Sequence, residues 1–443
     1  PLGAEMHALL AMVAIGGDDG WWRGAMVGKL IMTVFSLLTA VLVYSLGRRL
    51  FSPLAGVMAA AIYLGIPWVA HVSVTGLIDG VVAFYVIATV SLLLRWKDRH
   101  RGSSTYHGDN GWLLFAGWMA GSAAAVKYPP LVMLVLPIAV WLFAATMSTG
   151  GWKLAPSLQR TVLFLAMAFA ACGGWYAKNG LLTGNPVYPL AYRWFDGATR
   201  TDAKDQQWRD AHRDRDAEGR SYTLPQWVRS VERVLYKSEW LSPVLMPLAI
   251  CGFIASRGRK LRSVGLLIAV YLSLWWLVTH RIDRFWIPVM PLLALYAGEG
   301  AASAGWRASW SLIAPPMQMF TQLLMQFVVL ISSVLAMFVS SCEQPGVVRD
   351  TQFFVSLEEL RKQYSHPVHR WLNERYASDV ARDGASTMRV LLVGDAQPFM
   401  LDAPVLYNTC FDDCLFEQLL SGKSRRERLE SLRAAGITHV FIY

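Results

Sequence analysis

Residues 25–49 read AMVGKLIMTVFSLLTAVLVYSLGRR, a long and mostly apolar stretch that ends in two arginines. A helix needs about 20 apolar residues to cross the hydrocarbon core of a bilayer, which is roughly 30 Å thick. Lys and Arg residues in the short loops of membrane proteins collect on the cytoplasmic side. The stretch therefore predicts a transmembrane helix whose C-terminal end, at Arg48 and Arg49, faces the cytoplasm.

Similar apolar stretches recur along the first three quarters of the chain. Only helices and closed barrels satisfy all backbone hydrogen-bonding groups in lipid, and stretches of this length favour helices. We predict an all-α polytopic membrane domain with about ten transmembrane helices. Their expected ranges are 25–46, 53–72, 76–94, 112–127, 129–146, 161–178, 243–256, 263–279, 284–304 and 317–340.

The composition agrees with a protein that lies in a lipid bilayer. Hydrophobic residues make up 54% of the chain and the mean hydropathy is +0.35, which is more apolar than a typical soluble domain. A net charge of +10 is compatible with nucleic-acid binding. However, the basic residues stand between apolar stretches, where they meet lipid head groups. We therefore exclude nucleic acid as a partner.

Alternate threading of the predicted helices through the bilayer sorts the basic residues by side. The crowded face is cytoplasmic by the positive-inside rule, so residues 1–24, the loop 179–242 and the residues after 341 are expected outside. Tryptophans among charges in that loop favour helices lying on the membrane surface. The cytoplasmic face is predicted to hold Arg48, Arg49, Arg95, Lys97, Arg99, Arg101, Lys153, Arg160, Arg257, Arg259, Lys260, Arg262 and Arg307.

The C-terminal tail has the composition of a soluble domain. Its pattern predicts strands at 389–395, 403–408 and 437–443 and a helix at 424–435. This alternation implies a small soluble α/β lobe, so we expect a membrane domain over 1–342 and a lobe over 343–443. Cys410 and Cys414 are candidates for a disulfide there. Because residue 1 is Pro and the last residues resemble the middle of a strand, we expect the sequence to be a fragment.

An acidic residue at membrane depth is the first candidate for chemistry. Asp79 lies near the external end of the predicted span 76–94, beside His71 at the end of the preceding span. Ionisable groups in a membrane cost about 2.5–3.5 kcal/mol and mark functional sites. The carboxylate can bind a metal or a substrate hydroxyl, or accept a proton. The structural alternative is a carboxylate that stabilises the start of a helix.

Three basic residues break the charge sorting, because Lys127, Arg281 and Arg284 fall on the external side. Arg offers donors matched to phosphate oxygens, so an anionic partner explains them. The alternatives are a lysine that reaches the interface from a helix C-terminus and a local pair of Asp283 with Arg281 or Arg284. Lys178, at the end of the sixth predicted span, adds a further cation to the same face.

Glu5 and His7 near the start are also expected outside. They are two residues apart and so do not share one helix face. They are weak candidates for a divalent metal, and the start of an interfacial helix is the alternative. No other cofactor is indicated by the sequence.

The order of these features resembles the GT-C glycosyltransferases of bacteria, and most closely the protein-mannosyltransferase and aminoarabinose-transferase type. The resemblance covers roughly residues 1–345. Its motifs are the external Pro-Leu-x-x-Glu segment that ends at Glu5, Gly47-Arg48-Arg49-Leu50-Phe51, the intramembrane Asp79, Gly117-x-x-x-Gly121 with Lys127-Tyr128-Pro129, Thr183-Gly184-Asn185-Pro186-Val187-Tyr188-Pro189, and Asp283-Arg284-Phe285-x-x-Pro288-x-x-Pro291.

Membership would imply an inverting glycosyltransferase that uses a polyprenyl-phosphate-linked sugar at the external face of a bacterial inner membrane. Asp79 and Glu5 would then be catalytic carboxylates, and the family's main catalytic acid would lie upstream of Pro1. The acceptor, which is a lipid, a glycan or a protein, stays open. The residues expected to bind the donor phosphate are Lys127, Tyr128, Lys178, Arg281 and Arg284.

Two other functions compete with this hypothesis. A secondary transporter would place ionisable residues near the bilayer midplane, often in repeated halves, and the sequence shows neither. A membrane scaffold or sensor would use the tail to bind partners, but it leaves Asp79 and the external cations unexplained.

Overall fold

The structure is a computed structural model. It describes residues 2–16, 20–100, 110–149, 153–198, 200–212, 219–238, 240–256, 259–303, 323, 326–335, 359, 365–396, 398–409 and 412–443. The chain divides into two compact units, Pro1–Val347 and Val348–Tyr443. The predicted assignment of 1–342 and 343–443 to two functional domains stays a prediction.

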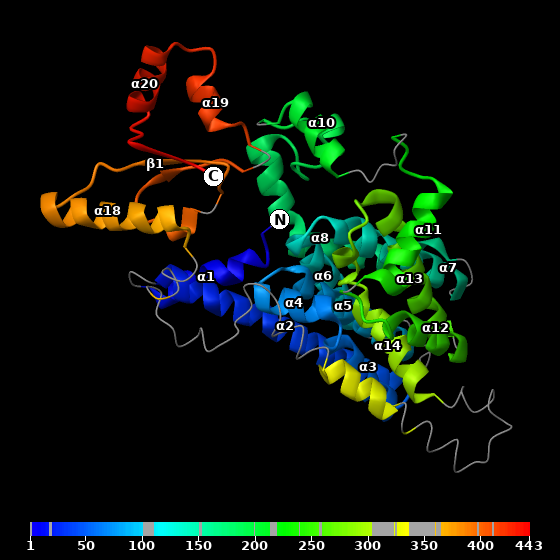
Figure 1. Ribbon diagram of the computed structural model, residues 1–443. Coiled ribbons are helices and arrows are strands. Elements are labelled where there is room, and N and C mark those ends of the chain that lie inside the picture. The colour runs from blue at the N-terminus through cyan, green and yellow to red at the C-terminus, as the bar shows by residue number, and fades with distance from the viewer. Residues whose placement is uncertain are drawn as a thin grey trace. The chain divides into compact units, whose positions relative to one another are not determined.

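The first unit is a bundle of helices (Figure 1), several of which are long and apolar. This confirms the predicted all-α membrane fold. Its helices are α1 (Glu5–Ile15), α2 (Gly20–Leu50), α3 (Pro53–Leu64), α4 (Pro67–Thr75), α5 (Asp79–His100), α6 (Gly111–Val126), the π-helix η1 (Leu131–Val135), α7 (Leu136–Thr149), α8 (Leu154–Thr183), α9 (Tyr192–Phe195), α10 (Asp202–Ala211), α11 (Leu224–Glu232), the π-helix η2 (Arg233–Lys237), α12 (Leu245–Ala255), α13 (Arg259–Val278), the 3-10 helix η3 (Asp283–Trp286), α14 (Met290–Ala302) and a helix at Gln326–Leu335.

Within the described residues, five helices are long and apolar enough to cross a membrane, and six if the bent pair α3 and α4 counts as one span. The predicted number of ten therefore stays a prediction. The predicted span 53–72 is bent by 60° between α3 and α4. The break follows from Gly65 at the end of α3 and Pro67 in the first turn of α4, since proline has no backbone N–H to continue a helix.

Other predicted boundaries also shift. Helix α8 continues to Thr183, where Gly184 ends it in a left-handed conformation, so the long loop begins after that point and not at 179. The predicted span 284–304 begins with η3, and its α-helix starts only at Met290. Much of the predicted span 317–340, together with Arg101, Arg257, Arg307, Cys342 and Cys410, lies outside the described residues.

Small residues let the helices of the bundle approach closely. Gly117 and Gly121 of α6 face the backbone of α8 at Phe164 and Ala168. Gly252 of α12 faces the Tyr296 carbonyl of α14 in the same way. Apolar side chains gain little from leaving lipid for a helix interface, because lipid tails are equally apolar. Helices in a membrane therefore gain stability from close van der Waals packing, which small residues allow.

We expect Gly252→Ala to destabilise the bundle by about 1–3 kcal/mol, because the added methyl group overlaps the backbone of α14. The matched control is Gly174→Ala in α8, where a methyl group meets no atom within 4 Å. Thermal unfolding of both variants in detergent measures the difference. Equal melting temperatures would contradict this packing.

The second unit holds a small parallel sheet, which confirms the predicted α/β lobe. Strand β1 (Val390–Val393) lies between β2 (Val405–Leu406) and β3 (His439–Ile442). The predicted helix at 424–435 is α20 (Arg425–Ala434), which follows α19 (Leu415–Leu420), and the 3-10 helix η4 (Pro398–Met400) connects β1 to β2. Helix α18 (Pro367–Asp383) was not foreseen.

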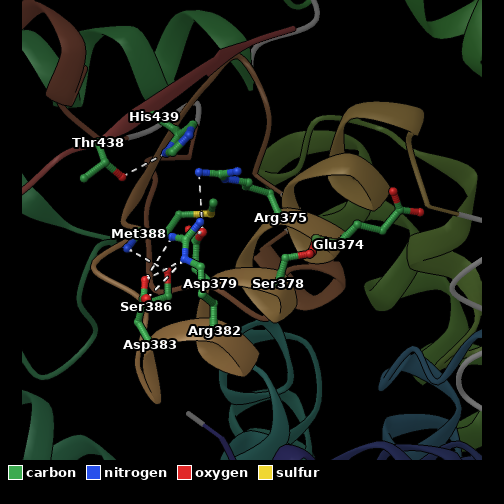
Figure 2. Close-up of polar contacts among 10 residues, drawn as sticks. All are labelled: Glu374, Arg375, Ser378, Asp379, Arg382, Asp383, Ser386, Met388, Thr438 and His439. Atoms are coloured by element: carbon green, nitrogen blue, oxygen red, sulfur yellow. Dashed lines mark hydrogen bonds and ion pairs between the residues drawn. The ribbon is translucent and has the colours of Figure 1, made fainter.

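Helix α18 makes one polar contact to the residues after β1 and several within its own exposed face. The Nε2 atom of its buried His369 lies 2.9 Å from an oxygen of Asp395, two residues after β1. Burial lowers the pKa of this imidazole, although Asp395 opposes the shift. Figure 2 shows the exposed side, where Arg375 and Arg382 both reach Asp379. Exposed pairs of this kind contribute little to stability, so the contact of His369 with Asp395 is the more important tie.

Candidate active site

Asp79 is the first residue of α5 and is only 2% exposed. The sequence predicted Asp79 inside the span 76–94, and the structure places it in the first turn of α5. The positive end of the helix dipole favours a carboxylate there. A buried carboxylate is costly unless it is paired. Its pairing partners therefore decide what this residue can do.

Lys127 is the first partner, with its Nζ 2.6 Å from Oδ1 of Asp79. It follows α6 directly, and Pro129 and Pro130 stop the helix from continuing. The ammonium group lies at the negative end of the α6 dipole. The ion pair thus joins the start of α5 to the end of α6, and each charge is also favoured by its own helix.

Arg284 is the second partner, because its Nε lies 3.7 Å from Oδ2 of Asp79. The ring of Phe285 lies 5.4 Å from Nζ of Lys127 and 5.9 Å from the guanidinium carbon of Arg284. Two aromatic residues of α13 hold the segment around η3. Tyr271 donates a hydrogen bond to the carbonyl of Phe285, and Trp275 donates one to the carbonyl of Ile282.

The Asp79–Lys127–Arg284 cluster combines one negative and two positive charges. The side chains of Lys127 and Arg284 are 25% and 31% exposed, whereas that of Asp79 is 3% exposed. The carboxylate thus holds both cations from the buried side, and their other sides stay accessible. Such a cluster has a net positive charge and can bind a further anion.

Tyr128 stands next to the cluster and is held by two hydrogen bonds. Its hydroxyl donates to the carbonyl of Tyr188 over 2.6 Å and accepts from the amide of Asn179 over 2.7 Å. Burial raises the pKa of this phenol, although the bond from Asn179 opposes the shift. The contact connects the end of α6 to the loop after α8, so Tyr128 orders the region around Lys127.

Arg281 takes a different position from the one expected. It is 3% exposed, and its guanidinium lies over the rings of Trp276 and Tyr222. It donates to the carbonyl oxygens of Trp276 and Ser221. These contacts tie the end of α13 to the long loop. Of the three cations that the sequence predicts on the external side, the structure brings Lys127 and Arg284 together at Asp79 and directs Arg281 to backbone carbonyls.

The two local pairs considered for Asp283 are replaced by other contacts. Asp283 accepts a hydrogen bond from Ser238, while Arg284 turns to Asp79. Trp240, two residues after Ser238, stacks on Trp68 of α4, with the ring centroids 4.6 Å apart. The segment before α12 therefore anchors η3 beside α4.

The remaining candidates lie around this region without a direct contact to Asp79 in the described residues. Glu5 is exposed at the start of α1, and the backbone N–H of Gly3 donates to the carbonyl of Ala125, close to Lys127. His7 packs against Phe35 of α2. Lys178 is exposed near the end of α8, with its ammonium 5.6 Å from the ring of Trp175.

Lys29 and Tyr271 were missed by the sequence reasoning. Lys29 of α2 passes close to Gly76, three residues before Asp79. A lysine inside the predicted span 25–46 was a usable signal, because charges at membrane depth are rare. Tyr271 carried no comparable signal, since aromatic residues are common near the ends of membrane helices.

A divalent metal finds no obvious site in the described part of the chain. No group of three or more His, Cys, Asp or Glu side chains is arranged there to hold one. Glu5 and His7 stay weak candidates from the sequence.

An apolar cavity of about 480 Å³ lies between α5, α7 and α13. Leu94, Trp141 and Leu274 are among its lining residues. Leu136 and Val140 are exposed, so the cavity opens at the surface of the bundle. Its wall also includes Val132, five residues after Lys127.

Comparisons with known proteins agree with this architecture. Residues 9–175, less than half of the chain, match the family model of dolichyl-phosphate-mannose-protein mannosyltransferase. ArnT from Cupriavidus metallidurans, solved bound to undecaprenyl phosphate, aligns with a TM-score of 0.54 over 99% of this chain and 79% of its own, at 14% identity. The chain has the GT-C fold. The resemblance seen in the sequence is thereby confirmed.

A second GT-C structure is similar to the chain to the same degree. The Archaeoglobus fulgidus oligosaccharyltransferase, in a complex with Zn and sulfate, aligns with a TM-score of 0.57 at 13% identity. The alignment covers 99% of this chain and 58% of that protein. No curated protein sequence matches the chain. At these identities the structures show the fold, and the activity has to be argued from the site.

Arg281 and Arg284 should respond differently to the same substitution. We expect Arg281→Gln to lower the stability by about 2–3 kcal/mol, because it removes charge-assisted bonds to buried carbonyls. We expect Arg284→Gln to keep the fold but to weaken the binding of an anion such as inorganic phosphate. Thermal unfolding and phosphate binding, measured on both variants, check this pair. An Arg281→Gln protein that is stable but has lost phosphate binding would show that Arg281 binds the anion and has no structural role.

His280 provides a pH-dependent test of the same region. Its ring packs edge-to-face on Phe285 at 4.8 Å and on His212 at 5.0 Å. Burial, followed by the charges of His212, Arg284 and Lys127, lowers its pKa from 6.5 to about 4. As the pH falls from 6.5 to 4, the unfolded chain gains a proton that the folded chain does not, so stability decreases.

We therefore expect the native protein to lose on the order of 1–3 kcal/mol of stability through His280 over this pH range, with the lower end favoured because the ring is partly exposed. The His280→Gln variant lacks this component and should show a flatter dependence. Unfolding in detergent between pH 7 and pH 4 measures both slopes. Identical slopes would contradict the half-buried position of the imidazole.

Proposed function

We propose that the full-length protein is a membrane glycosyltransferase that takes a sugar from a polyprenyl-phosphate donor and transfers it to an acceptor at the external membrane face. The observation that carries the proposal is the partly exposed pair of cations, Lys127 and Arg284, held by the buried Asp79. The GT-C fold supports the same reaction class.

The cation pair suits a phosphate that becomes a leaving group. A phosphodiester donor gains negative charge on the departing oxygen as the bond to the sugar breaks. Preorganised positive groups lower the barrier of such a step, because they require no rearrangement during the reaction. Lys127 and Arg284 are preorganised by their contacts with Asp79 and Phe285.

The apolar cavity between α5, α7 and α13 suits the lipid part of the donor. A polyprenyl chain is a hydrocarbon, and Leu94, Leu136 and Leu274 offer it an apolar lining. The cavity opens at the bundle surface, so a chain can enter it from the bilayer. The undecaprenyl phosphate in the ArnT structure supports this class of donor.

The transfer is proposed as a single displacement with inversion. The acceptor hydroxyl oxygen forms a bond to the anomeric carbon, and the bond from that carbon to the phosphate oxygen breaks. The phosphate takes the electron pair, and a carboxylate takes the hydroxyl proton. Glu5 is exposed and available as a carboxylate near this region, while both oxygens of Asp79 face cations.

This geometry refines the roles expected for the site residues. Asp79 stays in the proposed catalytic set as the residue that orients the cations. Tyr128 and Arg281 are proposed as positioning residues for Lys127 and η3, because their polar atoms are engaged with the protein itself. The role of Lys178 as a further phosphate contact stays a prediction.

The test is transfer of a radiolabelled sugar from undecaprenyl phosphate by the full-length protein in lipid nanodiscs, with an envelope extract as acceptor. We expect label to appear in the acceptor in equal amount to the free undecaprenyl phosphate released. Lys127→Ala should lower the rate about 100-fold or more, as expected for loss of a preorganised charge.

The matched control is Arg49→Gln, which also removes a cation from an ion pair, with Asp98. This variant should keep the native rate. Passage of the labelled sugar across the membrane without transfer would favour a transporter and overturn the proposal. Equal rates for Lys127→Ala and Arg49→Gln would show that the Asp79–Lys127–Arg284 cluster takes no part in the reaction.

A further inference from the structure

A groove of about 510 Å³ lies between α2, α5 and α6, and its lining residues differ from those of the apolar cavity. We call it the α2–α5–α6 groove. Each of the three helices contributes one face to it, because the lining residues recur at intervals of three and four. Leu38, Val41 and Phe115 of this lining are exposed, so the groove opens at the surface of the bundle.

The lining changes from apolar to basic along the groove. On α5 the lining residues are, in order, Phe84, Ala88, Ser91, Leu92 and Arg95, so the charge comes at one end. Phe84 and Arg95 are separated by roughly 16 Å along the helix axis, at 1.5 Å per residue. One leaflet of a bilayer has a hydrocarbon depth of about 15 Å, which is half of the whole core. The groove therefore has the length and the polarity of one phospholipid molecule, with the head group at Arg95.

An arginine and an indole ring form the basic end of the groove. The guanidinium carbon of Arg95 lies 5.6 Å from the centre of the Trp112 ring, which is at the start of α6. An arginine stacked on a ring still presents its in-plane N–H groups, and these match the oxygens of a phosphate. Tryptophan is enriched at the level of the lipid head groups. Both side chains thus suit the boundary between acyl chain and head group.

The charge at this end of the bundle favours an anion. Arg95 and Arg99 are exposed there, and within the described residues Arg95 forms no ion pair with a carboxylate. Asp98 pairs with Arg49 over 2.6 Å, so the charge of Arg49 is already compensated and we assign it no part in binding. The sequence 101–110, between α5 and α6, contains one Arg and one Asp and leaves the balance unchanged. Basic pockets between membrane helices bind anionic head groups.

We propose that the α2–α5–α6 groove binds an anionic phospholipid such as phosphatidylglycerol. The lipid phosphate bonds to Arg95 beside Trp112, and an acyl chain lies along the apolar part of the groove. Asp79 and Arg95 lie near opposite ends of α5, so this lipid is separate from the donor of the proposed transfer. The inference is independent of the proposed function, because it concerns binding and no reaction.

The experiment measures phospholipid binding to the delipidated full chain in detergent by native mass spectrometry, which counts the bound lipids. The probes are dioleoyl phosphatidylglycerol, dioleoyl phosphatidylcholine and inorganic phosphate. We expect the first phosphatidylglycerol to bind about fivefold more tightly than the first phosphatidylcholine, as expected for one basic residue that meets an anionic lipid. Equal affinities would indicate unspecific coating of the bundle and overturn the proposal.

A charge variant and a matched control locate the head group. Arg95→Gln should weaken phosphatidylglycerol about fivefold and leave phosphatidylcholine unchanged. The control is Arg262→Gln, which removes another exposed arginine at the same end of the bundle. Tyr296 shows that the two ends coincide, because it donates to the carbonyl of Leu261 and its ring lies 6.4 Å from that of Phe51, directly after α2. Arg262→Gln should bind phosphatidylglycerol like the native protein.

A second pair of variants locates the acyl chain. Ser45 lines the groove from α2, so the indole of Ser45→Trp occupies the space of the chain and should weaken both phospholipids. The control is Leu37→Trp, at a 52% exposed position of α2 outside the groove lining, and it should bind both lipids normally. Melting temperatures identify a variant that fails to fold. If Ser45→Trp fails, Arg95→Gln and Arg262→Gln decide the test.

Phosphatidylglycerol binding that is equal in Arg95→Gln and Arg262→Gln would overturn the proposed head-group site. Binding that is equal in folded Ser45→Trp and Leu37→Trp would overturn the place of the acyl chain. Inorganic phosphate that binds through Arg95 as tightly as phosphatidylglycerol would indicate a site for free phosphate and also overturn the proposal. Loss of sugar transfer in the native protein with intact phosphatidylglycerol binding would count against the proposed function alone.

Discussion

The buried carboxylate of Asp79 is the interaction on which the rest of the site depends. It lies at the positive end of the α5 dipole and is paired with Lys127 at the negative end of α6. Burying a carboxylate that is 2% exposed is costly unless it is well paired. The arrangement therefore fixes the ends of two helices relative to each other, and it brings Arg284 to the same point from a third segment.

Aromatic contacts keep that third segment in place. Tyr271 and Trp275 of α13 donate to carbonyl oxygens around η3, and Arg281 is sandwiched near Trp276 and Tyr222. Because arginine bonds to carbonyls and also packs on aromatic rings, Arg281 is suited to such a structural position. Arg281 therefore connects the end of α13 to the long loop, whereas Arg284 belongs to the partly exposed cluster around Asp79.

The surroundings of the cluster are divided by chemistry. An apolar cavity lies between α5, α7 and α13, and a pocket lined by polar and aromatic side chains lies between α10 and the end of α13. Under the proposed function, the apolar cavity suits the lipid part of the donor, and Lys127 and Arg284 suit its phosphate.

The sequence by itself determined the membrane character, the helical fold and the α/β lobe, because each follows from the local pattern of apolar and charged residues. It also singled out Asp79 as a carboxylate at membrane depth, and Lys127, Arg281 and Arg284 as basic residues that break the charge sorting. Only the tertiary structure decided that Asp79, Lys127 and Arg284 meet while Arg281 does not, and that a pocket forms between α10 and the end of α13. Such contacts join segments far apart in the chain, and their geometry depends on how closely the helices pack.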